Sequence, residues 1–124
     1  MLHFYKATVI RVIDGDTVVL SIDNGFHSRY ETSVRLLGFD APEVRTRDLE
    51  EKGRGLLAKQ RLEELIYSEG YDIYIRTEKS DSFGRWLGII YLDIDKYVCV
   101  NDIMKAYCEE LETPLPSTES EVPI

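Results

Sequence analysis

Acidic and arginine residues gather in three short segments of this 124-residue chain. The first is Asp14-Gly15-Asp16-Thr17, the second runs from Arg35 to Glu43 as Arg-Leu-Leu-Gly-Phe-Asp-Ala-Pro-Glu, and the third is Asp81-Ser82-Phe83-Gly84-Arg85. Each segment alone has an ordinary structural explanation, because Asp-Gly-Asp is a common turn and a solvated arginine often follows a loop glycine. Their combination in one small chain favours a chemical role.

The side chains in these segments are the types that phosphodiester hydrolysis requires. That reaction needs a hard cation on the phosphate, an oxygen base for the attacking water, and positive donors for the charge that grows on the phosphate oxygens. Carboxylate and carbonyl oxygens suit Ca²⁺ or Mg²⁺, and the planar fork of arginine matches phosphate oxygens bidentately. The chain supplies carboxylates at Asp16, Asp40 and Glu43 and guanidinium groups at Arg35 and Arg85.

Five segments have the composition and alternation of β-strands, and turn signals at 14–16 and 23–25 separate the first three. The expected strands cover residues 5–13, 17–22, 32–37, 71–77 and 86–92. A loop is expected at 80–82 and a further turn at 93–96.

Two segments have helical periodicity. The first expected helix runs from Asp48 to Ser68, and Gly70 is the stop signal that follows it. The second runs from Val100 to Leu111, with Asn101 as its expected cap. The residues expected to face the core are Leu56, Leu62, Leu65 and Ile66 in the first helix and Ile103, Met104, Tyr107 and Leu111 in the second. Since a helix between the third and fourth of five strands is the OB order, the predicted fold is α+β, mainly β: a five-stranded OB-type Greek-key barrel with two helices.

The charge is unevenly distributed along the chain. The formal net charge is -8, and residues 109–124 hold five glutamates with no lysine or arginine. Residues 113–124 add three prolines and are expected to form an acidic, disordered tail after a single domain at 1–112. Residues 45–61 carry six basic and three acidic side chains, so this stretch is either a solvated helix face or a track for backbone phosphates.

The cysteines and the N-terminus suggest a reducing compartment. Cys99 and Cys108 lack the spacing of a zinc site or redox pair and are interpreted as reduced, packed thiols. Residues 1–6 show no leader features, and no stretch approaches the roughly 20 apolar residues that span a membrane. We therefore expect a cytoplasmic protein, or a secreted one if a leader has been removed, with no membrane partner.

The motifs together resemble the staphylococcal nuclease (thermonuclease) family, which is built on an OB barrel. The resemblance rests on the Asp-Gly-Asp-Thr turn, the Arg-Leu-Leu-Gly-x-Asp-Ala-Pro-Glu segment, the Asp-x-x-Gly-Arg loop and Val100-Asn101 at the start of the last helix. These occur in the family's order and at similar spacing, over about residues 5–111.

The resemblance implies a Ca²⁺-dependent phosphodiesterase that acts on single-stranded or frayed DNA and on RNA and leaves 3′-phosphate ends. We expect the protein to be a monomer. It implies that Asp16 and Asp40 ligate the metal through carboxylates and Ala41 through its carbonyl. It also makes Glu43 the general base or water-orienting group, and it makes Arg35 and Arg85 the phosphate clamp.

Two departures from the family pattern keep other functions open. The chain after the second helix is short and acidic where the family continues with basic and aromatic residues, and Phe83 stands where tyrosine is common. Phe83 can still stack on a base as a substrate-binding residue, although it has no hydroxyl group. The alternatives are a non-catalytic OB module that binds nucleic acid and a protein-interaction domain, neither of which needs Glu43 beside two metal-binding aspartates.

Overall fold

The computed structural model describes residues 4–67, 72–80, 85–92 and 98–112 of the chain. The elements in chain order are β1 (Phe4–Asp14), β2 (Thr17–Gly25), β3 (Ser28–Leu36), α1 (Leu49–Tyr67), β4 (Asp72–Ser80), β5 (Trp86–Tyr91) and α2 (Val100–Glu112). The predicted turn at 93–96, the loop residues 81–82, the stop at Gly70 and the tail at 113–124 lie outside the described residues.

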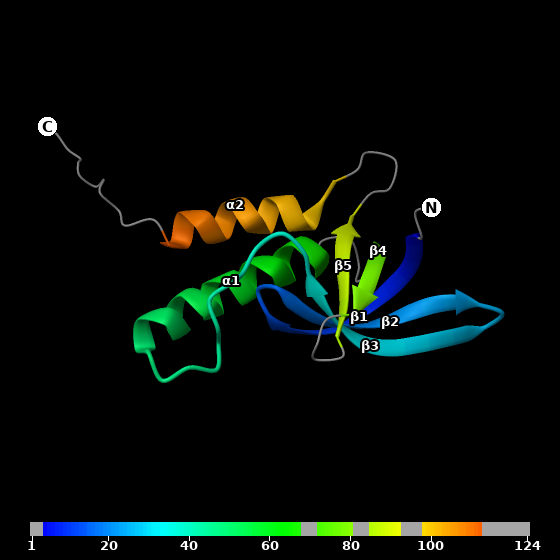
Figure 1. Ribbon diagram of the computed structural model, residues 1–124, viewed down its shortest axis with the longest axis horizontal. Helices are drawn as coiled ribbons and strands as arrows, with labels where there is room; N and C mark the ends of the chain where they lie inside the picture. The colour runs from blue at the N-terminus through cyan, green and yellow to red at the C-terminus, as the bar shows by residue number, and fades with distance from the viewer. Residues whose placement is uncertain (1–3, 68–71, 81–84, 93–97, 113–124) are drawn as a thin grey trace, which may run out of the picture.

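The five strands close into a barrel in the order β1-β2-β3-β5-β4. Antiparallel ladders join β1 to β2, β2 to β3, β4 to β5 and β1 to β4, while β3 and β5 run parallel. Figure 1 shows both helices on one side of the barrel, with the β2–β3 hairpin extending away on the other. The predicted OB-type α+β fold is confirmed.

The core is a set of aliphatic side chains from all five strands, closed at one end by α1. Helix α1 contributes Ala58, Leu62 and Ile66, all fully buried and spaced four residues apart. Leu56 was expected on this face but is 47% exposed, because it lies off the stripe that those three residues define. The strand residues of the core are Ala7, Val9, Val12, Val18, Leu20, Ile22, Val34, Leu36, Ile73, Ile75 and Ile90.

Asp48 sets the start of α1. Its Oδ1 accepts the backbone N–H groups of Glu50 at 3.0 Å and Glu51 at 3.3 Å, and its carbonyl accepts that of Lys52 at 2.9 Å. These are the bonds of an N-cap residue. These bonds fix where the segment between β3 and α1 ends and the helix begins.

The hairpin between β2 and β3 is longer than the sequence indicates. The two strands pair from Thr17 with Arg35 out to Gly25 with Ser28, leaving only Phe26 and His27 as the turn. Both have positive φ, at 55° and 59°, as this hairpin turn requires. Hydrophobic patterning missed the extension because residues 28–31 are exposed and bury no apolar side chain.

Asn101 does not cap α2 as predicted. The helix begins at Val100, as predicted, so Asn101 lies inside its first turn. The Asn101 residue is 5% exposed, and its amide is turned toward the barrel. Its Oδ1 accepts the N–H of Ile90 at 3.0 Å, and its Nδ2 donates to the carbonyls of Leu37 at 2.9 Å and Gly88 at 3.0 Å. Buried backbone groups of β5 outcompete the helix terminus for this side chain because they have no access to water.

Both cysteines are free thiols, as the sequence predicts. Cys108 is buried in the core cluster, and Cys99 is half-buried before α2. Burial raises the pKa of the Cys99 thiol above its ordinary value, so it is neutral at physiological pH. In the described residues, neither helix has the length and apolar composition needed to cross a membrane.

Candidate active site

Residues from all three predicted segments line one cavity of about 430 Å³. The β1–β2 turn, the exit of β3, the first turn of α1 and the residue before β5 each contribute to it. The lining residues are Asp14, Asp16, Thr17, Arg35, Asp40, Ala41, Glu43, Glu51 and Arg85. Six of the seven predicted site residues are therefore together, and the seventh, Phe83, lies outside the described residues.

Asp16 connects the hairpin turn to the exit of β3. Its carboxylate is buried and accepts the Thr17 hydroxyl at 2.9 Å and the Ala41 N–H at 2.9 Å. Its backbone carbonyl accepts the N–H of Leu36 at 2.8 Å. These bonds hold two segments that are 25 residues apart in a fixed relation.

Arg35 links the two predicted metal-ligating carboxylates. Its Nη2 lies 3.2 Å from Asp16 Oδ2 and also forms an ion pair with Asp40 Oδ1. The Asp16 side chain is 10% exposed and that of Asp40 is 89% exposed, so this charge cluster runs from the protein interior to solvent. The same nitrogen lies 3.4 Å from the Phe39 carbonyl. Among the described residues, these contacts leave Nε and Nη1 of Arg35 available for another ligand.

Two further acids hold the segment that carries Glu43. The Glu43 N–H donates to Glu51 Oε2 at 3.2 Å, and the Val44 N–H donates to Asp14 Oδ1 at 3.3 Å. Sequence reasoning assigned neither acid to the site. The Asp-Gly-Asp pattern predicts a turn at Asp14, and Glu51 is one of several acids near the start of α1. Glu43 itself is exposed, so its carboxylate can meet water in the cavity.

Two glycines let these segments approach closely. A Cβ on Gly15 would lie 2.6 Å from Ala58 Cβ and 3.0 Å from Ala41 Cβ, so the hairpin turn packs directly against α1. A Cβ on Gly55 would lie 2.5 Å from the Glu43 carbonyl oxygen. Helix α1 therefore supports the backbone of Glu43 at van der Waals distance, and any side chain at Gly55 would displace it.

Comparison with known proteins identifies the family of this barrel. A family model described as staphylococcal nuclease homologue matches residues 33–106. The chain belongs to this family. The matched range includes Arg35, Asp40, Glu43 and Arg85 and begins after the β1–β2 turn that carries Asp16.

A curated relative matches over a longer stretch. The chain is 28% identical to Protein ParB of Escherichia coli over 90 residues. That alignment covers 73% of this chain and 44% of the relative, so the chain spans less than half of the relative's length.

The donor chemistry of the cavity suits a hard cation in this staphylococcal nuclease homologue. Asp16, Asp40 and the Ala41 carbonyl offer only oxygen atoms, which Ca²⁺ prefers. Within the part of the chain that the structure describes, no group of three His, Cys, Asp or Glu side chains could hold a metal ion. The oxygen donors predicted for a cation are two carboxylates and one backbone carbonyl, while Asp14 and Glu51 each accept a backbone N–H.

The two glycines of α1 provide a matched test of the Glu43 support. Gly55→Ala should destabilise the fold by about 1–3 kcal/mol, because its methyl group overlaps the Glu43 backbone. The same displacement of Glu43 should lower kcat. Gly53→Ala meets nothing within 4 Å and should stabilise the fold by about 0.5–1 kcal/mol. Thermal unfolding and initial cleavage rates of both variants test this. An equal gain in stability from both substitutions would contradict the close packing at Gly55.

Proposed function

We propose that this protein is a Ca²⁺-dependent phosphodiesterase that hydrolyses single-stranded or frayed DNA and RNA and leaves 3′-phosphate ends. One observation carries the proposal: Asp16, Arg35, Asp40, Glu43 and Arg85 converge on one cavity from separate parts of the chain. A module that only binds nucleic acid would need basic and aromatic side chains and would gain nothing from a carboxylate at Glu43.

The arginines would bind the phosphate. Arg35 keeps Nε and Nη1 available among the described residues, and Arg85 lines the same cavity, so two guanidinium groups can meet the non-bridging oxygens from two sides. Charge on these oxygens rises as water adds to phosphorus, and donors already in place stabilise that charge without reorganising.

Glu43 would accept the proton of the attacking water. Its backbone is held by Glu51 and supported at Gly55, which fixes where the carboxylate can reach. A 3′-phosphate product requires that a P–O bond to water forms while the bond from phosphorus to the 5′-oxygen breaks. The departing 5′-oxygen would take its proton from solvent, to which the Asp40 side of the cavity is open.

Asp16, Asp40 and the Ala41 carbonyl would hold the cation. Ca²⁺ would supply Lewis acidity, polarising a phosphate oxygen. The Ala41 N–H and the Thr17 hydroxyl fix the orientation of the Asp16 carboxylate before any ligand binds.

Cleavage assays with labelled single-stranded DNA and RNA in Ca²⁺, in Mg²⁺ and in EDTA test the proposal. We expect cleavage in Ca²⁺, none in EDTA, and products whose 3′ ends are phosphatase-sensitive. Glu43→Gln should lower kcat by about 10²- to 10⁴-fold with Ca²⁺ binding retained, whereas Glu31→Gln, at an exposed position on β3 outside the cavity, should have no effect. Undiminished cleavage in EDTA would contradict the metal requirement, and tight binding without cleavage in any metal would favour a binding module.

A further inference from the structure

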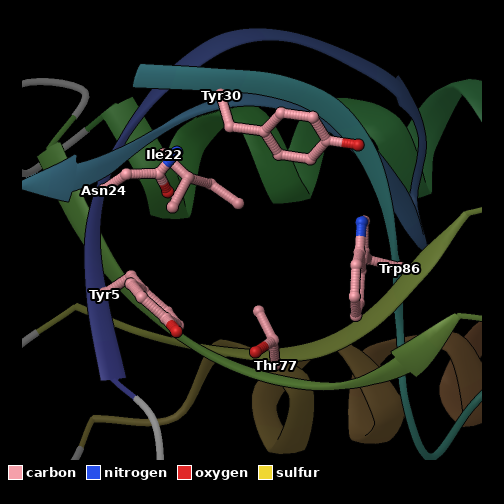
Figure 2. A pocket seen from close by; sticks show the side chains of 6 residues that line it. All are labelled: Tyr5, Ile22, Asn24, Tyr30, Thr77 and Trp86. Carbon is pink, nitrogen blue, oxygen red and sulfur yellow. The ribbon is translucent and has the colours of Figure 1, made fainter. Parts of the chain in front are cut away.

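The barrel has a second pocket, at the end away from α1. It has a volume of about 130 Å³ and is seen along the barrel axis in Figure 2. We call it the mouth pocket, and its lining residues are Tyr5, Ile22, Asn24, Tyr30, Thr77 and Trp86. None of these residues lines the candidate active site.

The mouth pocket is the open end of the barrel interior. Its residues continue the inward-facing alternation of the core, as Trp86 does two positions before Gly88 on β5. A Cβ on Gly88 would lie 2.9 Å from Ile75 Cδ1 and 3.1 Å from Val34 Cγ1, so the barrel is tightly filled at this level. The pocket is therefore a shallow cup with an aliphatic floor.

Aromatic rings surround this cup. Figure 2 shows Tyr5 and Trp86 on opposite sides of the opening and Tyr30 pointing across the top toward Trp86. The Asn24 amide and the Thr77 hydroxyl provide polar groups at the edge. Ring faces with a few polar atoms are how proteins hold bases of single-stranded nucleic acid.

The volume of the cup selects among aromatic ligands. An apolar cavity of about 150 Å³ holds one benzene molecule. A volume of about 130 Å³ thus suits one six-membered ring and is small for a fused purine. Pyrimidine bases have a single ring of this kind, with polar atoms on its edge for Asn24 and Thr77.

The cup is next to the candidate active site along the chain. Arg85 lines the active-site cavity, and the following residue, Trp86, lines the cup. On β3, Tyr30 in the cup and Arg35 in the site are five positions apart, roughly 16 Å along the strand. A base in the cup would therefore belong to a nucleotide other than the one at the cleaved bond.

We propose that the mouth pocket binds one pyrimidine base of a nucleic acid strand whose scissile phosphate lies between Arg35 and Arg85. This inference rests on the proposed function. It adds to that function a preference for a pyrimidine at a nucleotide away from the cleaved bond. The preference comes from the size of the cup and the stacking surface of its rings.

Trp86 makes the proposal directly measurable, because it is the single tryptophan of the chain. Intrinsic fluorescence is followed in EDTA, so that the substrate stays intact, during titration with oligothymidylate, oligodeoxyadenylate and an abasic oligomer of equal length. We expect oligothymidylate to quench Trp86, oligodeoxyadenylate to act only at higher concentration, and the abasic oligomer to have no effect.

Two variants on the β2–β3 hairpin provide the matched comparison. Tyr30→Ala should weaken oligothymidylate binding by about 5- to 150-fold, the range for loss of one stacked base. Phe26→Ala removes a fully exposed ring at the hairpin tip, outside the cup, and should leave binding unchanged. Equal losses from both variants would overturn the assignment.

A parallel cleavage assay separates this inference from the proposed function. Cleavage in Ca²⁺ without any change in Trp86 fluorescence would overturn the base-binding role and leave the nuclease proposal standing. Quenching by oligothymidylate without cleavage in any metal would support the cup and contradict the nuclease. A dimer that Phe26→Ala dissolves, with fluorescence insensitive to all oligomers, would overturn the inference by showing that the cup holds an aromatic side chain of a second copy.

Discussion

Replacing Arg35 or Arg85 with alanine should lower kcat on single-stranded DNA by about 10²- to 10⁵-fold. Both side chains line the cavity that holds Asp16, Asp40 and Glu43. Each guanidinium would stabilise charge that exists only as the phosphate passes through its transition state, so kcat should fall more than KM rises. Lysine should rescue either position poorly, since one ammonium group cannot match two phosphate oxygens.

Calcium binding should distinguish the two arginines. Arg35 pairs with both Asp16 and Asp40, so Arg35→Ala removes the positive charge next to the proposed metal ligands. That variant should bind Ca²⁺ at least as tightly as the wild type, because a competing cation is gone. Isothermal titration with Ca²⁺ measures this separately from kcat. A loss of Ca²⁺ binding in Arg35→Ala would mean that Arg35 is needed to hold the two carboxylates in place.

A control arginine separates the cavity from general charge effects. Arg11 is exposed on β1 and does not line the cavity, so Arg11→Ala should leave kcat unchanged. If Arg35→Ala or Arg85→Ala kept the kcat of the wild type, the role assigned to that arginine would be wrong.

The sequence predicted the fold because periodicity and turn chemistry agree along most of the chain. The buried stripe of α1 has the spacing of an amphipathic helix, and the helix begins next to Asp48, where the sequence predicts its start. The length of the β2–β3 hairpin was underestimated because residues 28–31 of β3 are exposed, and hydrophobic alternation reports only burial.

The candidate site was predictable where a residue type points to chemistry by itself. Arg35, Asp40 and Glu43 stand in one motif, and the barrel brings Asp16 and Arg85 to them. The supporting acids, Asp14 and Glu51, could not be assigned this way. They act by accepting backbone amides from a segment distant in sequence, and no local pattern reports which amides will need a partner.

The role of Asn101 in the fold could not be predicted either, because its hydrogen-bond partners are distant in the sequence. A polar residue at a helix start predicts a cap, yet this amide holds β5 and the exit of β3 instead. Its bond to the Leu37 carbonyl is three residues before Asp40, so α2 is connected through Asn101 to the segment that enters the site. The stability of the barrel should therefore depend strongly on this one side chain.

Asn101→Ala should destabilise the protein by about 2–4 kcal/mol, because it leaves the buried Ile90 N–H and the Leu37 and Gly88 carbonyls without this partner. The midpoint of thermal unfolding should fall by roughly 5–15 °C. Asp102→Ala is the matched control, since Asp102 is the exposed neighbour in the first turn of α2 and contributes at most about 1 kcal/mol there.

Asn101→Asp tests which of the three bonds matter. This substitution keeps an oxygen for the Ile90 N–H but places a carboxylate against the Leu37 and Gly88 carbonyl oxygens. It should destabilise the fold at neutral pH at least as much as Asn101→Ala does, because a buried charge then faces two partial negative charges. Wild-type stability of Asn101→Asp at neutral pH would show that the two bonds donated by the amide contribute little, and that the Ile90 contact alone holds α2 against β5.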